Sequence, residues 1–97
     1  MRHMKVKVVY LGVVRHKVGR KEEEYEVSEG SSLKDLLTKI VEAHIALKDL
    51  AGSLNDSQID PTLIATLNGF AVNLNSSRNV ILKDGDTLTL MTVIGGG

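Results

Sequence analysis

The sequence predicts an α+β fold: a mixed sheet of four to five strands with one main helix packed on one face. Strand-like apolar segments occupy about 4–11 and 87–94, near the two ends of the chain. Between them, residues 32–51 carry the clearest amphipathic helical pattern. Two tight-turn signals, Asn68-Gly69 and Asp84-Gly85-Asp86, divide the remainder. A hairpin, one crossing helix and a return of strands is the element order of a sheet that a helix covers on one side.

The N-terminal part predicts a hairpin with strands at about 4–11 and 20–28. The first strand alternates lysine and valine and then becomes continuously apolar, as in a strand buried on one face and partly on the other. Gly12 and Gly19 bracket a polar connection that we expect to be a hairpin loop. In the second strand, the run Glu22–Glu24 is expected on a solvent face or an edge, where its charge discourages aggregation.

The helix at about 32–51 begins with a capping-box pattern, because Ser32 can serve as N-cap and Asp35 follows three residues later. Gly52 is a natural stop signal. Apolar side chains recur at helical spacing and form one stripe, which comprises Leu33, Leu36, Leu37, Ile40, Val41, His44 and Leu47.

The C-terminal third predicts three more strands. Those at about 62–68 and 70–74 are joined by Asn68-Gly69, a strong short-range hairpin signal. The turn Asp84-Gly85-Asp86 then leads into the last strand at about 87–94. No repeat or linker divides the 97 residues, so residues 1–97 are expected to form a single domain.

Composition excludes several classes of function. The 12 Lys+Arg balance the 12 Asp+Glu, and the aromatic residues are few, so we expect no nucleic-acid partner. The chain has no cysteine, which suits a reducing compartment. We expect no membrane association, since apolar runs are short and the N-terminus lacks a signal-peptide pattern. A cytoplasmic protein is predicted, with Met4 as a plausible natural start after a three-residue extension.

The side chains do not predict an active site. His3, His16 and His44 are isolated, and His44 lies on the helical stripe, where a packed structural role is expected. Adjacent residues of a strand point to opposite faces, so Glu22–Glu24 cannot all converge on one cation. The paired serines at 31–32 and 76–77 have no base at nucleophile spacing, so they are assigned to a cap and a loop. We therefore expect no metal, no stably bound cofactor and no intrinsic catalytic residue.

The C-terminus is the one segment that suggests chemistry. The apolar run Leu90–Ile94 leads directly into Gly95, Gly96 and Gly97. Glycine lacks Cβ, so this tail 95–97 can adopt conformations that other residues avoid and can enter a channel that a side chain would block. Three extended residues reach roughly 10 Å. The pattern predicts a flexible arm that carries the terminal carboxylate away from a fixed strand.

Together these stretches resemble the ubiquitin-like sulfur carriers of β-grasp fold, most closely the small subunit of molybdopterin synthase (MoaD type, in the MoaD/ThiS family). The resemblance rests on the opening strand, on Ala65–Gly69 and on Leu82–Leu88 running to the terminal glycines. It spans the whole chain. The length and the long helix fit the molybdopterin type better than the shorter thiamine type. Thr92-Val93 stands where two prolines are usual in molybdopterin-type members.

The resemblance implies a carrier and not an enzyme. A partner of the ubiquitin-activating type would adenylate the Gly97 carboxylate with ATP and Mg²⁺, and a sulfur donor system would convert it to a thiocarboxylate. Gly95 and Gly96 would thread the partner's channel. In molybdopterin-type systems a large catalytic subunit then takes the sulfur for a pterin precursor in molybdenum cofactor biosynthesis.

Residues near the tail and on the free sheet face are candidates for a partner interface, with core packing as an equally weighted alternative. They are Phe70, Met91, Val93 and Ile94. Three other functions remain open from the sequence. The first is a protein modifier joined through Gly97 to lysines. The second is a sulfur carrier for thiamine or tRNA thiolation, and the third is an interaction module with an inert tail.

Overall fold

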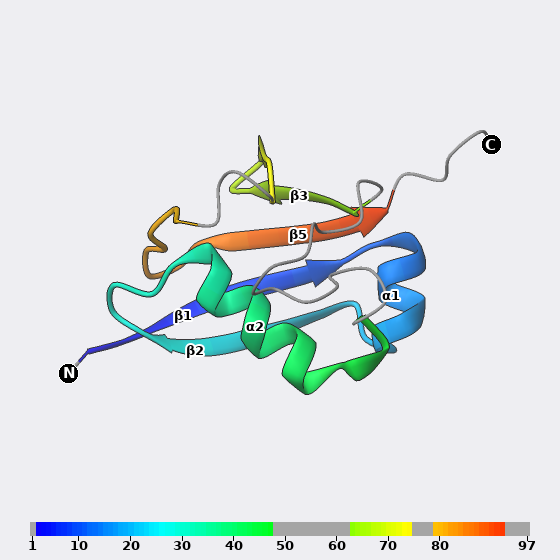
Figure 1. Cartoon of the computed structure of the whole chain (residues 1–97), viewed down its shortest axis with the longest axis horizontal. Coiled ribbons are helices and arrows are strands. Elements are labelled where there is room, and N and C mark those ends of the chain that lie inside the picture. The colour runs from blue at the N-terminus through cyan, green and yellow to red at the C-terminus, as the bar shows by residue number, and fades with distance from the viewer. Residues whose placement is uncertain (1, 48–62, 75–78, 93–97) are drawn as a thin grey trace.

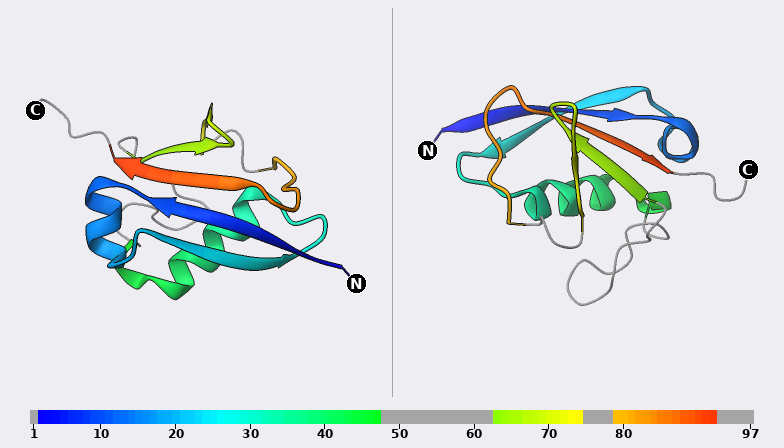
Figure 2. Two further views of the ribbon diagram at one scale, coloured as in Figure 1. Left: turned by 180° about the vertical axis from the view of Figure 1, so that it is seen from behind. Right: turned by 90° about the horizontal axis from the view of Figure 1, so that it is seen from above.

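The computed structural model describes residues 2–47, 63–74 and 79–92. It confirms the predicted fold class. Five strands form one mixed sheet in the order β2-β1-β5-β3-β4, and α2 covers one face of it (Figures 1 and 2). The elements are β1 (His3–Tyr10), α1 (Gly12–Val18), β2 (Glu22–Ser28), α2 (Leu33–Ala43), the 3₁₀ turn η1 (Ile45–Leu47), β3 (Leu63–Leu67), β4 (Phe70–Val72) and β5 (Thr87–Thr92).

The central pair of strands, β1 and β5, is parallel, and all other neighbouring pairs are antiparallel. Alternate residues of β1 are buried against the helical layer, as the period of two requires. In β5 the same alternation buries Leu88 and Leu90. The core therefore lies between the sheet and α2, and none of the helices in the described part of the chain lies on the opposite face of the sheet (Figure 2).

The predicted capping box is present at the start of α2. The Asp35 backbone N–H donates to Ser32 Oγ at 3.2 Å, and the Ser32 N–H donates to Asp35 Oδ2 at 2.9 Å. The α-helix ends sooner than the sequence pattern predicted. His44 leaves the helical conformation with φ −132°, and its ring turns toward the sheet and contacts Glu23. Residues 48–51 of the predicted helix lie outside the described residues.

The connection between β1 and β2 is a helix, α1, where a loop was expected. Val14 is buried, and Val18 packs against the core one helical turn later. Gly19 ends the helix in the left-handed region with φ 82°, and its N–H donates to the Arg15 carbonyl at 2.7 Å. A seven-residue helix gains little from propensity alone, so burial of these two valines is what stabilises it.

Hydrogen bonds of the Asn68 side chain join the two predicted turns. Asn68 Nδ2 donates to Asp86 Oδ1 at 2.9 Å, and the Thr87 N–H donates to Asn68 Oδ1 at 2.9 Å. The buried Asp86 also accepts the Lys83 N–H at 2.7 Å. Asn68 sits in the left-handed region with φ 53°, which asparagine tolerates better than most residues. The hairpin turn and the Asp-Gly-Asp turn thus fix the start of β5.

Substitution Asn68→Ala is expected to lower the free energy of unfolding by about 2 kcal/mol. The change removes the two side-chain hydrogen bonds of Asn68. It also leaves an alanine in the left-handed region, which alanine adopts less readily than asparagine. Urea denaturation measures the loss. Asn68→Gly is the matched variant: it loses the same bonds without the strain, so it should be the less destabilised of the two. Equal losses would show that backbone strain contributes nothing at this turn.

Candidate functional site

The C-terminal end of β5 is held in the middle of the sheet. Thr92 is the partner of Leu63 in β3, and the Leu11 N–H beyond β1 donates to the Leu90 carbonyl at 3.0 Å. Because β1 and β5 are parallel, α1 lies at this same end of the molecule (Figure 1). A segment that leaves β5 here therefore starts from a position fixed by neighbours on both sides.

The candidate tail residues themselves are not described. Gly95, Gly96 and Gly97 lie outside the described residues, as do the interface candidates Val93 and Ile94. The roles assigned to them remain predictions. What the structure supplies is the anchor for the tail at Thr92.

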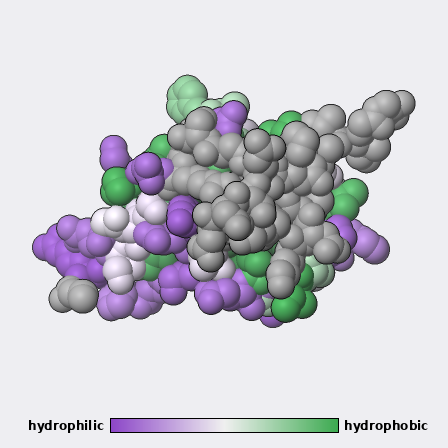
Figure 3. Space-filling model, in the orientation of Figure 1, coloured by the Kyte–Doolittle hydropathy of each residue, from purple (hydrophilic) through white to green (hydrophobic). Residues whose placement is uncertain are grey.

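The structure does not bring the other two interface candidates together. Phe70 pairs with Leu67, which in turn pairs with the buried Leu88. Phe70 therefore lies on the helix-covered face of the sheet, level with the start of β5. Met91 pairs with Ile64 and lies on the open face near the end of β5. Phe70 is nevertheless 78% exposed, because β4 is a short edge strand. Figure 3 shows hydrophobic surface over this hairpin at the top of the view.

The open face of the sheet has two halves of different chemistry. On β1 and β2, three ion pairs cross between the strands: His3–Glu26 at 3.5 Å, Lys5–Glu24 at 3.8 Å and Lys7–Glu22 at 3.4 Å. The other half is apolar or uncharged, and we call it the open-face patch. It consists of Val9, Ile64, Thr66, Ala71, Thr89 and Met91. This patch adjoins the end of β5.

A polar cluster joins the strands to the end of α2 at the same end of the molecule. Glu23 Oε1 accepts from Tyr10 OH at 2.7 Å, from Tyr25 OH at 3.1 Å and from His44 Nε2 at 2.5 Å. The rings of Tyr10 and His44 meet edge to face, 5.9 Å between centroids. His44 is the packed structural histidine that its place on the helical stripe predicted.

The electrostatics of this cluster follow from its contacts. Burial raises the pKa of Glu23, but hydrogen bonds from Tyr10 and His44, with the positive charge of His44, outweigh it, and the pKa is held below the ordinary value. Burial, with hydrogen bonds to Tyr25 and Glu23, raises the pKa of Tyr10 well above its ordinary range, so the phenol stays a donor. β2 is an edge strand, as the Glu22–Glu24 run predicted. The expectation of a solvent face was wrong for Glu23, whose side chain points to the helical layer and is 19% exposed.

The sequence did contain a signal for this inward placement. Glu23 alternates with Tyr25 and the buried Val27, so the period of a strand assigns all three to one face. The charge of the Glu22–Glu24 run concealed that alternation. His44, whose hydrogen bond stabilises the inward-facing carboxylate, lies 21 residues away in the sequence.

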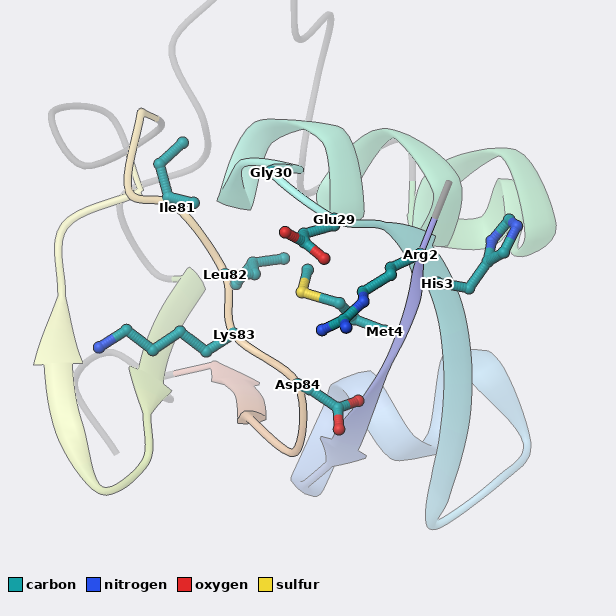
Figure 4. A pocket seen from close by; sticks show the side chains of 9 residues that line it. All are labelled: Arg2, His3, Met4, Glu29, Gly30, Ile81, Leu82, Lys83 and Asp84. Atoms are coloured by element: carbon teal, nitrogen blue, oxygen red, sulfur yellow. The ribbon is translucent and has the colours of Figure 1, made fainter.

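An open groove lies at the other end of the molecule (Figure 4). It encloses about 670 Å³ between the start of β1, the turn after β2 and the segment before β5. Its floor is apolar, from Met4 and Leu82, and its rim carries both signs of charge, from Arg2, Lys83, Glu29 and Asp84. It is remote from the end of β5 and contributes nothing to the candidate site.

The described residues also bear on two other classes of function. No group of three or more His, Asp or Glu side chains within residues 2–47, 63–74 and 79–92 could hold a metal ion. Within the same ranges, no helix is long and apolar enough to cross a membrane.

Comparison with known proteins assigns the family. The model of the ThiS family matches residues 8–97. The molybdopterin synthase sulfur carrier subunit of Chlamydomonas reinhardtii is 30% identical over 94 residues, which cover 97% of this chain and 100% of that protein.

Solved structures agree with the fold. SAMP1 from Haloferax volcanii superposes with a TM-score of 0.81 at 20% identity, covering 96% of this chain and 99% of that one. A putative molybdopterin converting factor, subunit 1, from Pyrococcus furiosus gives 0.74 at 31% identity, covering 94% and 99%. The complex of subunits 1 and 2 of molybdopterin-converting factor from Helicobacter pylori gives 0.58 at 26% identity, covering 97% and 100%. With a family match over nearly the whole chain and a β-grasp fold that matches these neighbours, this chain belongs to the ThiS family, whose MoaD- and ThiS-type members are carrier proteins and not catalytic enzymes.

Proposed function

We propose that this protein is a sulfur carrier for molybdopterin biosynthesis that acts through the C-terminal carboxylate of Gly97. The observation that carries the proposal is the position of β5. It lies between β1 and β3 and ends beside the open-face patch, so the residues after Thr92 leave from the interior of the sheet and not from a frayed edge. The relationship to sulfur carrier subunits supports the chemistry.

The proposed chemistry takes place in partner proteins. An adenylyltransferase of the ubiquitin-activating type, using ATP and Mg²⁺, joins AMP to the Gly97 carboxylate and releases pyrophosphate. A persulfide sulfur then attacks the acyl carbon, the bond to AMP breaks, and a thiol reductant cleaves the resulting acyl disulfide to leave a thiocarboxylate. Gly95 and Gly96 thread the channel, since a chain without side chains fits where others cannot. The carrier supplies reach and orientation, and no group of its own reacts besides Gly97.

A large catalytic subunit is the proposed acceptor of the sulfur. The relative from Helicobacter pylori was solved as a complex of two subunits, which supports a partner of that kind. We propose that the open-face patch is the surface on which it docks, with Met91 at the side of the patch nearest the tail and Val93 and Ile94 continuing it along the tail. Because ATP and the reduced sulfur donors are required, the proposal places the protein in the cytoplasm.

Protein modification is the second candidate function, in which Gly97 forms isopeptide bonds with lysines. Its support is the likeness in fold to small archaeal modifier proteins and to Urm1 from Trypanosoma brucei. The two functions share the adenylation step, so activation alone does not separate them. Carriers for thiamine or for tRNA thiolation differ from the first candidate only in the acceptor.

The intact mass of the protein purified from its native host separates these functions. Replacement of one terminal oxygen by sulfur is the result expected for a carrier, and an alkylating reagent should add one alkyl group to the terminal sulfur. Lysine side chains of other proteins that bear a glycine remnant are the result expected for a modifier. A tail that is a free acid in every preparation, together with an unchanged phenotype when Gly97 is deleted, would contradict both.

A further inference from the structure

Positive charge is concentrated at the N-terminal part of the chain. Residues 1–21 contain seven of the 12 Lys+Arg and none of the 12 Asp+Glu. The lysines of β1 are compensated by β2 through the ion pairs Lys5–Glu24 and Lys7–Glu22. Arg2 lies in the groove at the other end of the molecule. The remaining basic residues form a group on and just after α1, which we call the α1 basic cluster: Arg15, His16, Lys17, Arg20 and Lys21.

This cluster is almost without counter-charge. Within residues 2–47, 63–74 and 79–92, Arg20 alone of the five makes an ion pair, with Glu23 at 3.7 Å, and its side chain is 68% exposed. Arg15 Nε donates to the Tyr10 carbonyl at 3.0 Å, which fixes the side chain but leaves its charge uncompensated. Lys17 and Lys21 make no ion pair in that part of the chain.

Helix stability accounts for only part of the cluster. Basic residues in the last turn of a helix are favourable because they face the negative end of the helix dipole, and Arg15, His16 and Lys17 are placed there. Arg20 and Lys21 follow the helix and gain nothing from it. Like charges held close together cost free energy, so helix stability does not explain why all five basic residues are grouped here.

Its position supplies that reason. The Leu11 N–H at the start of α1 donates to the Leu90 carbonyl of β5, so the cluster and the end of β5 lie at one end of the molecule (Figures 1 and 2). Five residues follow Thr92 in the sequence, and they can span at most about 17 Å. A protein that takes in the end of this tail must therefore bring the rim of its entrance close to α1.

We propose that the α1 basic cluster is the electrostatic recognition surface for the protein that activates the tail, and that this partner carries carboxylates around the entrance to its channel. The inference rests on the proposed function and adds the chemistry of the partner surface. Charges at the rim of an interface act chiefly on the rate of association and on its dependence on salt. A nucleic acid fits less well, because the neighbouring Glu22–Glu26 segment would repel phosphates and the basic surface is short.

The test uses the double substitution Lys17→Glu/Lys21→Glu and the activating enzyme of the same organism, with adenylation followed by ATP–pyrophosphate exchange. Neither side chain makes an ion pair or a hydrogen bond within the described residues. We expect KM for the carrier to rise about tenfold at low salt with kcat unchanged, and the difference to shrink at about 0.5 M salt. Lys39→Glu/Lys83→Glu is the matched control, since it makes the same change in net charge at exposed positions away from α1.

The outcomes are distinct. If both double variants shift KM equally, or if the α1 variant shifts it with no dependence on salt, the inference is wrong although the carrier function stands. If the unsubstituted protein is not adenylated, the proposed function itself fails. Salt-sensitive binding of unfractionated tRNA that the α1 variant alone loses would replace the acidic protein with a nucleic acid. If circular dichroism shows that the Lys17→Glu/Lys21→Glu variant is unfolded, Lys17→Gln/Lys21→Gln tests the same surface with a smaller expected rise in KM.

Discussion

Deletion of Gly97 is expected to abolish ATP-dependent activation of the chain while its stability stays unchanged. The deletion withdraws the terminal carboxylate by about 3.5 Å, the length of one extended residue. In a closed active site a displacement of 1 Å can cost about a hundredfold in rate, so the loss should exceed that factor. Pyrophosphate exchange with the activating enzyme measures the loss, and thermal denaturation checks that the fold is intact.

Two further tail variants separate reach from channel width. Addition of a fourth glycine keeps every existing residue but moves the carboxylate outward, so it should be nearly as inactive as the deletion. Gly96→Val keeps the length and adds a branched side chain, which should obstruct a narrow channel and raise KM as well as lower kcat. Full activity in the deletion variant would show that the Gly97 carboxylate is not the reacting group.

The fold could be predicted from sequence because its strongest signals are local. The alternation in β1 and β5 and the capping box of α2 each involve residues close together in the chain. The Asn68-Gly69 and Asp84-Gly85-Asp86 turns were equally visible, although their mutual hydrogen bonds were not. These elements leave few ways to build a sheet with one helical layer.

The errors arose where tertiary contacts override local pattern. The segment that forms α1 contains valines and basic residues, which are compatible with a loop as well as with a short helix. Burial of Val14 and Val18 against the core favours the helix. Phe70 and Met91 were grouped by their apolar character, yet the strand register places them on opposite faces. Register depends on the pairing of distant strands and cannot be derived from either segment alone.

Removal of the Glu23 side chain is expected to have the largest effect on stability among the substitutions considered. Glu23→Ala leaves the hydroxyls of Tyr10 and Tyr25 and the ring of His44 without their common acceptor. Tyr10 is fully buried and cannot turn to water. Loss of a carboxylate that three donors share should lower the free energy of unfolding by about 3 kcal/mol, as measured by urea denaturation near neutral pH.

The charge of Glu23 should also be visible in the dependence of stability on pH. Hydrogen bonds and the charge of His44 overcome the effect of burial and hold the pKa of Glu23 below its ordinary value in the folded protein. The folded state therefore binds this proton less readily than the unfolded state. The stabilisation is complete above the ordinary glutamate pKa and is lost as the pH falls through the lowered pKa of the folded protein.

Glu23→Gln isolates this contribution. It keeps a side-chain oxygen for the tyrosines, so the loss near neutral pH should be smaller, about 1 kcal/mol, and the acid dependence due to Glu23 should vanish. Glu24→Gln is the matched control, because within the described residues the Glu24 side chain makes one exposed ion pair, with Lys5 at 3.8 Å, and its removal should change stability little. If Glu23→Gln retains the full acid dependence of the unsubstituted protein, that dependence belongs to other carboxylates. The cluster would then hold the end of α2 to the sheet by hydrogen bonding alone.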